Sequence, residues 1–267
     1  MPEREAGCHD VRVRLVEDSE RHRARSFGDV ADDYDRARPS YPIEAVRWLL
    51  GRDPLEVLDL GAGTGRLTQL LLDAGHSVVA VEPLDALRRK LAAGIPQTRV
   101  LDGRAEDIPV SDGSADAVVV SQAFHWFDAE RTLPEIRRVL RPGGTLGLLW
   151  NFRERSQAWM RDLAAITSQD GLPAGWHTDL QALPHVDLVE RRDFPLEQVV
   201  DPDKLLALVR SWSKVASCSL RERQEILRRV GELWDRHPEL AGTSQATMEY
   251  RTETYRVRFA YRRPAAR

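Results

Sequence analysis

The sequence predicts an α/β protein whose parallel sheet is doubly wound, with helices packed on both of its faces. Five short apolar runs alternate with segments of helical periodicity, and the runs lie at 55–60, 77–82, 98–101, 115–121 and 144–150. Strands that are apolar throughout are typical of parallel sheets buried on both sides. A glycine-rich turn directly follows the first run. Such a fold binds its ligand beyond the carboxyl ends of the strands.

The composition is ordinary for a soluble protein and excludes several classes. Of 267 residues, 42% are hydrophobic and 30% charged, which fits one large domain or a domain with a helical appendage. The net charge of −3 predicts no nucleic-acid partner. The N-terminus lacks the apolar core of a signal peptide and no long apolar span occurs, so we expect a cytoplasmic protein that uses no membrane. Cys8 and Cys218 lie in unrelated contexts, so neither a disulfide nor a metal site is expected.

Three regions are predicted along the chain. Residues 1–25 form a charged N-terminal tail, 26–151 form the α/β core, and 152–267 form a helical cover plus the last antiparallel strands of the same sheet. The core opens with helices. The first is expected to begin at Ser26, a suitable N-cap, and its apolar face includes Tyr34.

The turn "LGAGTGRL" at 60–67 is the most informative stretch of the sequence. Gly61, Gly63 and Gly65 remove side chains where the backbone passes from strand to helix, so a ligand can approach the main-chain N–H groups. The next strand ends in Glu82, and a carboxylate at that position can accept both hydroxyls of a ribose. The pattern predicts a nucleoside ligand.

A nicotinamide dinucleotide is the competing ligand for such a turn. Its G-x-G-x-x-G fingerprint requires a third glycine at position 66, where this chain has Arg66. The part of the signature that contacts pyrophosphate is therefore imperfect, whereas the part that contacts ribose is intact. A nucleoside without a pyrophosphate fits better, and S-adenosylmethionine (SAM) is such a ligand.

Four stretches of the sequence, matching in order and spacing, carry a family resemblance. "VLDLGAGTG" (57–65), "GRAEDIPVSDGSADAVVVSQAFHWFD" (103–128) and "IRRVLRPGGTLGLLW" (136–150) resemble the class I SAM-dependent methyltransferases. The opening "FGDVADDYDRARPSYP" (27–42) is similar to the first helix of a small-molecule branch with ubiquinone/menaquinone-type and trans-aconitate-type enzymes. The resemblance implies a Rossmann-like sheet of seven strands and SAM as the cofactor.

The resemblance also implies a role for each matching position. The positions implied to bind SAM are Tyr34, Asp59, Gly61, Ala62, Gly63, Gly65, Glu82, Pro83, Leu84, Ala105, Glu106, Ser121, Gln122 and Trp126. The positions after the first strand would hold the methionine end of SAM, and the positions after the second strand would hold its ribose and adenine. Those after the third strand would meet the adenine edge, and those after the fourth the reactive sulfonium. The family often has an acidic or amide residue where this chain has Arg104.

Several of these residues also have a purely structural interpretation. Asp59 can be a hydrogen-bond acceptor for the following helix, and Tyr34 lies on an apolar helix face that is core by default. Arg38 either caps carbonyl groups in solvent or binds a carboxylate of the substrate. The turn "LRPGG" is expected to deliver the fifth strand.

His125 and Trp126 follow the fourth strand and are candidates for contact with the substrate. The imidazole of His125 titrates near neutrality, so it would serve as general base if the acceptor must lose a proton. In the alternative, His125 bonds to a neighbouring group while Trp126 packs beneath a helix. Arg38 and Trp212 are the other predicted substrate residues.

The C-terminal region is expected to cover the site. A helix is predicted over 201–212, with a capping Asp and a Pro in its first turn, and a second over 220–237. Two strand-like segments follow the pattern of antiparallel strands, at 185–200 and 246–261. In the latter the apolar residues change parity, which predicts a bend or bulge near 251–254.

The expected function is metal-independent methyl transfer from SAM to a small organic acceptor with an oxygen, nitrogen or carbon nucleophile. A SAM-binding protein of a biosynthetic pathway that does not methylate would carry the same cofactor motifs. An oxidoreductase that uses NAD is disfavoured by Arg66. A monomer or homodimer is expected, and the fold does not select the acceptor.

Overall fold

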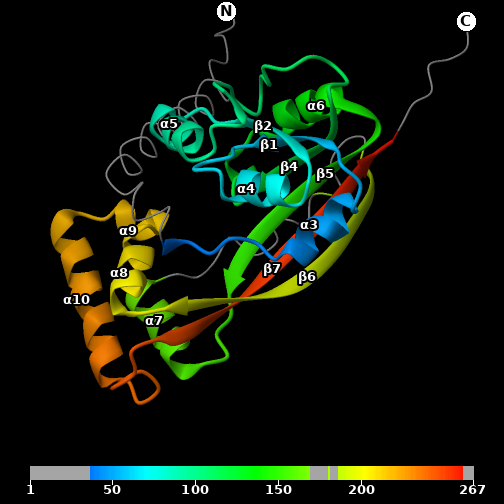
Figure 1. The fold of residues 1–267 in the computed structure, drawn as a ribbon. Coiled ribbons are helices and arrows are strands. Elements are labelled where there is room, and N and C mark those ends of the chain that lie inside the picture. Colours follow the sequence, from blue (N-terminus) through cyan, green and yellow to red (C-terminus); the bar gives the residue numbers. More distant parts are fainter. Residues whose placement is uncertain (1–36, 169–179, 181–185, 261–267) are drawn as a thin grey trace, which may run out of the picture.

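The computed structural model describes residues 37–168, 180 and 186–260. These residues form a seven-stranded sheet of order β3-β2-β1-β4-β5-β7-β6, in which β7 runs antiparallel to both of its neighbours (Figure 1). The strand order reverses between β1 and β4. The predicted doubly wound sheet is confirmed. Its switch point, where ligands bind in such folds, lies at the carboxyl ends of β1 and β4.

The five predicted core strands are present. The strands are β1 (Glu56–Leu60), β2 (Ser77–Val81), β3 (Arg99–Leu101), β4 (Ala115–Ser121), β5 (Leu140–Arg153), β6 (Val186–Val200) and β7 (Ala246–Phe259). β5 begins earlier than expected, because "LRPGG" does not form a separate turn. The register shifts from Ala115 opposite Leu140 to Ala117 opposite Thr145, and Gly143 takes a φ of 82° within the resulting bulge.

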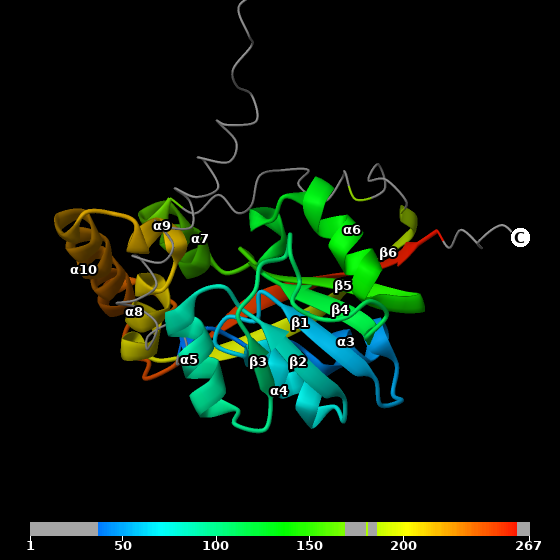
Figure 2. The same ribbon diagram turned by 90° about the horizontal axis from the view of Figure 1, so that it is seen from above.

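Helices cover both faces of the sheet (Figure 2). One face packs against α3 (Ile43–Leu50), α4 (Arg66–Asp73) and α5 (Asp85–Gly94), and the other against α6 (Ala129–Val139). Strand residues alternate between these faces: Val57 and Leu149 pack with α3 and α4, whereas Leu58 and Trp150 pack on the α6 face. The parity of a residue along β5 therefore decides on which face its side chain lies.

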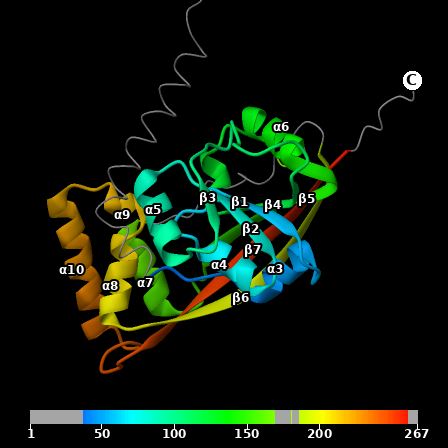
Figure 3. The same ribbon diagram turned by 45° about the horizontal axis from the view of Figure 1, so that its top comes forward.

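Four helices gather at one end of the molecule in all ribbon views (Figure 3). They are α7 (Ala158–Thr167), α8 (Pro202–Arg210), α9 (Ser213–Ala216) and α10 (Leu220–Arg236). The predicted cap is present, since Asp201 accepts a hydrogen bond from the Lys204 N–H at 2.7 Å. Ser219, which was not predicted as a cap, begins α10 in a capping box with Glu222. The expected helical cover is confirmed.

The bend predicted near 251–254 is wrong. β7 pairs without interruption with β5 from Arg258 to Tyr250, opposite Thr145 to Arg153. The apolar parity changes because the two ends of the strand face different cores: Met248 packs with the cover helices, whereas Tyr255 packs on the α6 face. A regular strand between two cores gives the same pattern as a bulged strand over one core.

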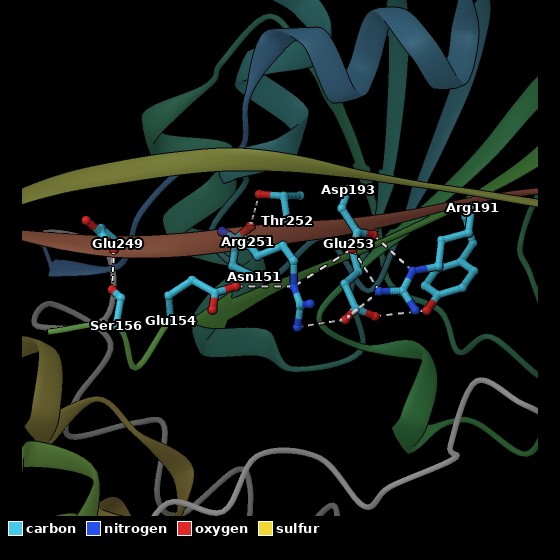
Figure 4. A network of polar contacts seen from close by, with 10 residues as sticks. Asn151, Glu154, Ser156, Arg191, Asp193, Glu249, Arg251, Thr252 and Glu253 are labelled. Carbon is cyan, nitrogen blue, oxygen red and sulfur yellow. Dashed lines mark hydrogen bonds and ion pairs between the residues drawn. The ribbon is translucent and has the colours of Figure 1, made fainter. Parts of the chain in front are cut away.

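An ion-pair network joins the middle of β7 to β6 on the α6 face (Figure 4). The buried Glu253 carboxylate pairs with Arg191 at 3.0 Å and Arg251 at 3.2 Å, and it accepts the Tyr255 hydroxyl at 2.9 Å. On the opposite face, the Thr252 hydroxyl donates to the Asn151 side chain at 2.7 Å. These contacts fix β5, β6 and β7 in register beside the end of β5.

Some predictions fall outside the described residues. They are the charged tail at 1–25, the first helix from Ser26 and the proposed cofactor contact of Tyr34. Among the residues that the structure does describe, none belongs to a helix long and apolar enough to span a bilayer.

Candidate functional site

The glycine turn after β1 has the backbone conformation that the sequence predicts. Gly61, Gly63 and Gly65 have φ values of 72°, 60° and 91°, in the left-handed region that favours glycine. The N–H groups of Gly61 and Ala62 donate to the Val81 carbonyl at 2.8 and 3.1 Å, which ties the turn to the end of β2. Gly65 is the N-cap of α4, so the turn presents the start of a helix at the switch point.

Glu82 lies immediately after β2 and holds the glycine turn. One carboxylate oxygen accepts the Gly63 N–H at 2.9 Å, and the other accepts the Leu84 N–H at 2.9 Å. The side chain is buried, with 5% of its surface exposed. A carboxylate oxygen can accept more than one hydrogen bond, so the atoms that hold these N–H groups can also accept ribose hydroxyls.

Asp59 is placed beneath the turn and takes the structural role left open by the sequence. Its carboxylate is fully buried and accepts the Thr68 hydroxyl of α4 at 2.6 Å. Its second oxygen, Oδ1, has no hydrogen-bond partner among the described residues. Burial raises the pKa of Asp59 to about 7, and the nearby negative charge of Glu82 adds to the increase.

Replacing Asp59 with Asn is expected to stabilise the ligand-free protein at high pH and to have little effect at low pH. In the unfolded chain this carboxyl ionises near 3.8, whereas in the fold it ionises near 7. Below pH 3.8 the carboxyl is protonated in both states, and the fold has its full stability. As the pH rises to about 7, ionisation in the unfolded chain lowers the free energy of unfolding, by up to about 1.4 kcal/mol for each unit of difference between the two pKa values. Melting temperatures of D59N and the wild type, measured from pH 4 to 8, test this.

The variant Asp116→Asn is the control for that experiment. In Asp116 the effect of burial is outweighed by Arg141 and the Glu56 N–H, so its pKa is lowered and D116N should lose stability above pH 4. A gain for D59N that did not grow between pH 4 and 8 would contradict the assignment.

A pocket of about 650 Å³, counting space open to solvent, lies over the switch point. Its residues come from the glycine turn, from the segment before α3, from the ends of β4 and β5, and from α8 and β7. The described lining is Arg38, Pro39, Tyr41, Gly61, Ala62, Gly63, Thr64, Arg66, Leu67, Ser121, Gln122, Asn151, Arg153, Leu208, Trp212 and Tyr250. Five of the predicted cofactor residues and two of the predicted substrate residues, Arg38 and Trp212, therefore meet in one cavity.

The end of β4 shows a strained conformation at the pocket. Gln122 has a φ of 54°, which is uncommon for a residue with a side chain. Its backbone N–H donates to the Leu149 carbonyl at 2.9 Å, and its side-chain amide donates to the Asn151 carbonyl at 3.3 Å. Strain of this kind is concentrated at functional sites, because the surrounding structure must hold it.

Arg38 and Trp212 close the pocket from the cover side. The Arg38 guanidinium donates to the Ser211 carbonyl at 2.9 Å and to the Ser211 hydroxyl at 3.3 Å, so it links the segment before α3 to the end of α8. Trp212 is 3% exposed, and the Arg153 guanidinium lies 3.8 Å from the centre of its ring. Both residues line the pocket, and their contact with a substrate stays a prediction.

His125 and Trp126 lie on the other side of the sheet. They belong to a short 3-10 helix, Phe124–Trp126, and the Trp150 indole on the α6 face donates to the His125 Nδ1 at 3.5 Å. Trp126 is 38% exposed and lies against His125. The described pocket lining includes neither residue. The arrangement matches the alternative in which the imidazole bonds to a neighbouring group.

The predicted cofactor residues that follow β2 and β3 lie outside the described pocket lining, as do Asp59 and Gly65. Pro83 is exposed and Leu84 half-buried at the start of α5, and Arg88 donates to the carbonyls of Glu82 and Pro83. Ala105 is buried, and the Glu106 carboxylate accepts the Asp128 N–H at 3.0 Å. Pro83, Leu84, Ala105 and Glu106 lie outside the described lining of the pocket.

The sequence did not point to Asn151, Arg153 or Tyr250. Asn151 and Arg153 have the same parity in β5 as Leu149, and Tyr250 is the partner of Arg153 in β7. Only their position in the sequence could have indicated them, because polar residues at the carboxyl end of a central strand often face the ligand. Tyr250 reaches the pocket only through the antiparallel pairing of β7 with β5.

Comparison with known proteins decides the family. The uncharacterized methyltransferase Rv3342 of Mycobacterium tuberculosis is 43% identical over 243 residues, which cover 91% of this chain and 99% of that protein. The chain belongs to the class I SAM-dependent methyltransferases. The family described as "Methyltransferase domain" matches residues 58–148 of this methyltransferase, which include the glycine turn and Glu82.

Two further comparisons support the family and the fold, respectively. The uncharacterized methyltransferase-like protein C25B8.10 of Schizosaccharomyces pombe is 32% identical over 243 residues, covering 85% of this chain and 92% of that protein. A solved structure from Anaeromyxobacter dehalogenans, described as a candidate type II methyltransferase, has 24% identity and a TM-score of 0.63. It covers 83% of this chain and 97% of its own, and supports the fold. Family and fold imply the use of SAM.

Proposed function

We propose that this methyltransferase transfers the methyl group of SAM to a small organic acceptor in the pocket over the switch point. The observation that carries the proposal is the joint placement of Glu82 and the glycine turn beneath that pocket. Glu82 holds the Gly63 N–H, and Gly63 lines the cavity with Ser121 from the end of β4.

The residues present fit SAM. A side chain built at Gly63 would meet no atom within 4 Å, so the turn leaves room for a ligand against its backbone. The Thr64 hydroxyl lines the pocket and is buried with no hydrogen-bond partner among the described residues. A buried polar atom without a partner is costly, and a ligand with a carboxylate or ammonium group would provide one.

Each part of the site has a distinct task in the proposal. SAM, when bound, would supply a methyl carbon already activated by its sulfonium, for transfer to a nucleophilic atom of the acceptor. The protein must hold the acceptor in line and exclude water. Glu82 and the turn fix the nucleoside and methionine ends, Gln122 and Asn151 border the reacting region, and α8 with Trp212 covers it.

Calorimetry and product analysis test the proposal. We expect the protein to bind SAM and not NAD, and to form S-adenosylhomocysteine when incubated with SAM and fractions of a small-molecule extract. S-adenosylhomocysteine is measured by mass spectrometry, with a fraction-free incubation as control. No heat with SAM would exclude the proposal. Binding of SAM without product in any fraction would favour a SAM-binding protein that does not methylate.

A further inference from the structure

Gln122 lies beside the glycine turn in the wall of the pocket. It directly follows β4, and it belongs to the described pocket lining together with Gly61. The next residue, Ala123, packs against the turn, since a Cβ built at Gly61 would lie 3.0 Å from the Ala123 Cβ. The side chain of Gln122 extends to the end of β5, where it contacts Asn151. In the proposed function this is the region where donor and acceptor meet.

The hydrogen bond to β5 decides which way the Gln122 amide faces. The backbone carbonyl of Asn151 can only accept, so the nitrogen Nε2 of Gln122 is the atom that faces it, at 3.3 Å. The side-chain oxygen Oε1 is the other branch of the amide, and it has no hydrogen-bond partner among the described residues. Gln122 therefore offers a ligand an oxygen that can accept a hydrogen bond.

The surrounding strands hold this amide in place. Gln122 keeps its left-handed φ of 54° because its backbone N–H is bonded to the Leu149 carbonyl at 2.9 Å. The residue that carries the accepting carbonyl, Asn151, is itself fixed by its side chain. It accepts the Thr252 hydroxyl at 2.7 Å and donates to the Ser40 carbonyl at 2.9 Å (Figure 4). A side chain ordered before the ligand arrives loses less entropy on binding.

We infer that Gln122 selects the acceptor: its Oε1 accepts a hydrogen bond from the hydrogen on the atom that is to be methylated. A hydroxyl or an amine can donate this hydrogen and still keep a lone pair, whereas a carbon nucleophile has no such hydrogen to donate. An amide does not ionise near neutrality, so Gln122 orients the nucleophile, and the proton lost on methylation passes to water. This inference rests on the proposed function, because it assumes that SAM occupies the glycine turn. It adds the class of nucleophile and the residue that recognises it.

Calorimetry with sinefungin and S-adenosylhomocysteine tests the inference without a known acceptor. The two compounds share the nucleoside and amino acid ends of SAM. Sinefungin has an amino group, protonated near neutrality, at the place of the transferred methyl group, and S-adenosylhomocysteine has no substituent there. An ammonium group only donates hydrogen bonds, so its binding detects an accepting oxygen and not the remaining N–H of the amide. We expect the wild type to bind sinefungin about tenfold or more tightly than S-adenosylhomocysteine.

Two substitutions of Gln122 should remove this preference. Gln122→Met has nearly the same length without the amide, so the two compounds should bind with similar affinity and that for S-adenosylhomocysteine should change little. Gln122→Asn tolerates the left-handed φ but is one methylene shorter, so it should also lose most of the preference. Wild-type melting temperatures in either variant show that it is folded.

Gln69→Met is the matched control. Gln69 also donates through Nε2, to Asp73 at 2.8 Å, but it does so on the exposed side of α4 and is absent from the described pocket lining. Q69M should prefer sinefungin as the wild type does. An equal loss of the preference in Q69M and Q122M would overturn the inference, because the effect would not depend on the position of the amide.

The other outcomes separate this inference from the proposed function. If the wild type binds neither compound, the proposed function fails. If it binds both with equal affinity, or if Q122M keeps the preference for sinefungin, only the inference about Gln122 fails. If Q122M weakens both compounds equally, by about tenfold, Gln122 serves the donor and the inference is overturned. Where an extract fraction yields S-adenosylhomocysteine, a new methyl group on oxygen or nitrogen in the product identifies the acceptor as a hydroxyl or an amine, and one on carbon overturns the inference.

Discussion

Replacing Glu82 with Gln is expected to raise the dissociation constant for SAM by about 100-fold or more. The carboxylate accepts backbone N–H groups from Gly63 and Leu84 on its two oxygens. An amide keeps one oxygen and turns an NH₂ group towards the other N–H, so one side of the turn loses its acceptor. Hydrogen bonds to a charged acceptor contribute about 1.5–3 kcal/mol each, and two such contacts to the ribose would account for the predicted loss.

Glu222→Gln is the control for this variant. Glu222 also accepts a backbone N–H, from Ser219 at 2.9 Å, but it does so in the capping box of α10. E222Q should cost some thermal stability and leave SAM affinity unchanged. Calorimetric titration and thermal melting of both variants separate binding from folding. If E82Q bound SAM as the wild type does, Glu82 would be a structural clamp and the ribose assignment would be wrong.

The parts of the fold that the sequence predicts are those encoded locally. The buried strands are continuous apolar runs, and the turn between β1 and α4 requires left-handed φ values at Gly61, Gly63 and Gly65. Capping of α8 by Asp201 likewise needs only a few neighbouring residues. These features could be placed from the sequence because their physical causes lie within one or two turns of chain.

Features that depend on distant pairing could not be predicted in this way. Tyr250 reaches the pocket because β7 returns antiparallel to β5 and brings it opposite Arg153. The change of apolar parity in β7 suggested a bulge, because a single strand does not reveal that its ends face different cores. The sequence could not state on which face of the sheet His125 would lie, and this decides whether its imidazole borders the pocket.

The contact partner of Asp59 could not be decided from the neighbouring sequence. A carboxylate at the end of a strand before a glycine turn can contact either the ligand or the following helix. In the structure it is bonded to Thr68, nine residues further along, and is fully buried. Its bond to Thr68 joins β1 to α4, and this contact between helix and sheet could not be decided from the local sequence.

Alanine at Gly63 is expected to abolish detectable SAM binding while the protein remains folded. Gly63 has a φ of 60°, so a side chain there adds strain of about 1–2 kcal/mol. A methyl group at that position meets no protein atom within 4 Å, and Gly63 lines the pocket. The methyl would therefore occupy space that a ligand needs for close approach to the backbone. Melting and calorimetry should show a small loss of stability and a complete loss of binding.

Two other glycines separate the backbone effect from the loss of ligand space. Gly51 ends α3 with a φ of 86° and a ψ of −156°, a conformation that glycine alone adopts readily, and it has open space around it, so G51A should lose at least as much stability as G63A and keep normal SAM binding. At Gly65 an added Cβ would lie 2.8 Å from Ile95 and 2.9 Å from Leu91, so G65A should be less stable than G63A. If G63A bound SAM with the same affinity as G51A, the ligand would not approach the turn at Gly63. Binding lost in G63A alone, at a stability no lower than that of G51A, requires a ligand against the pocket side of the turn.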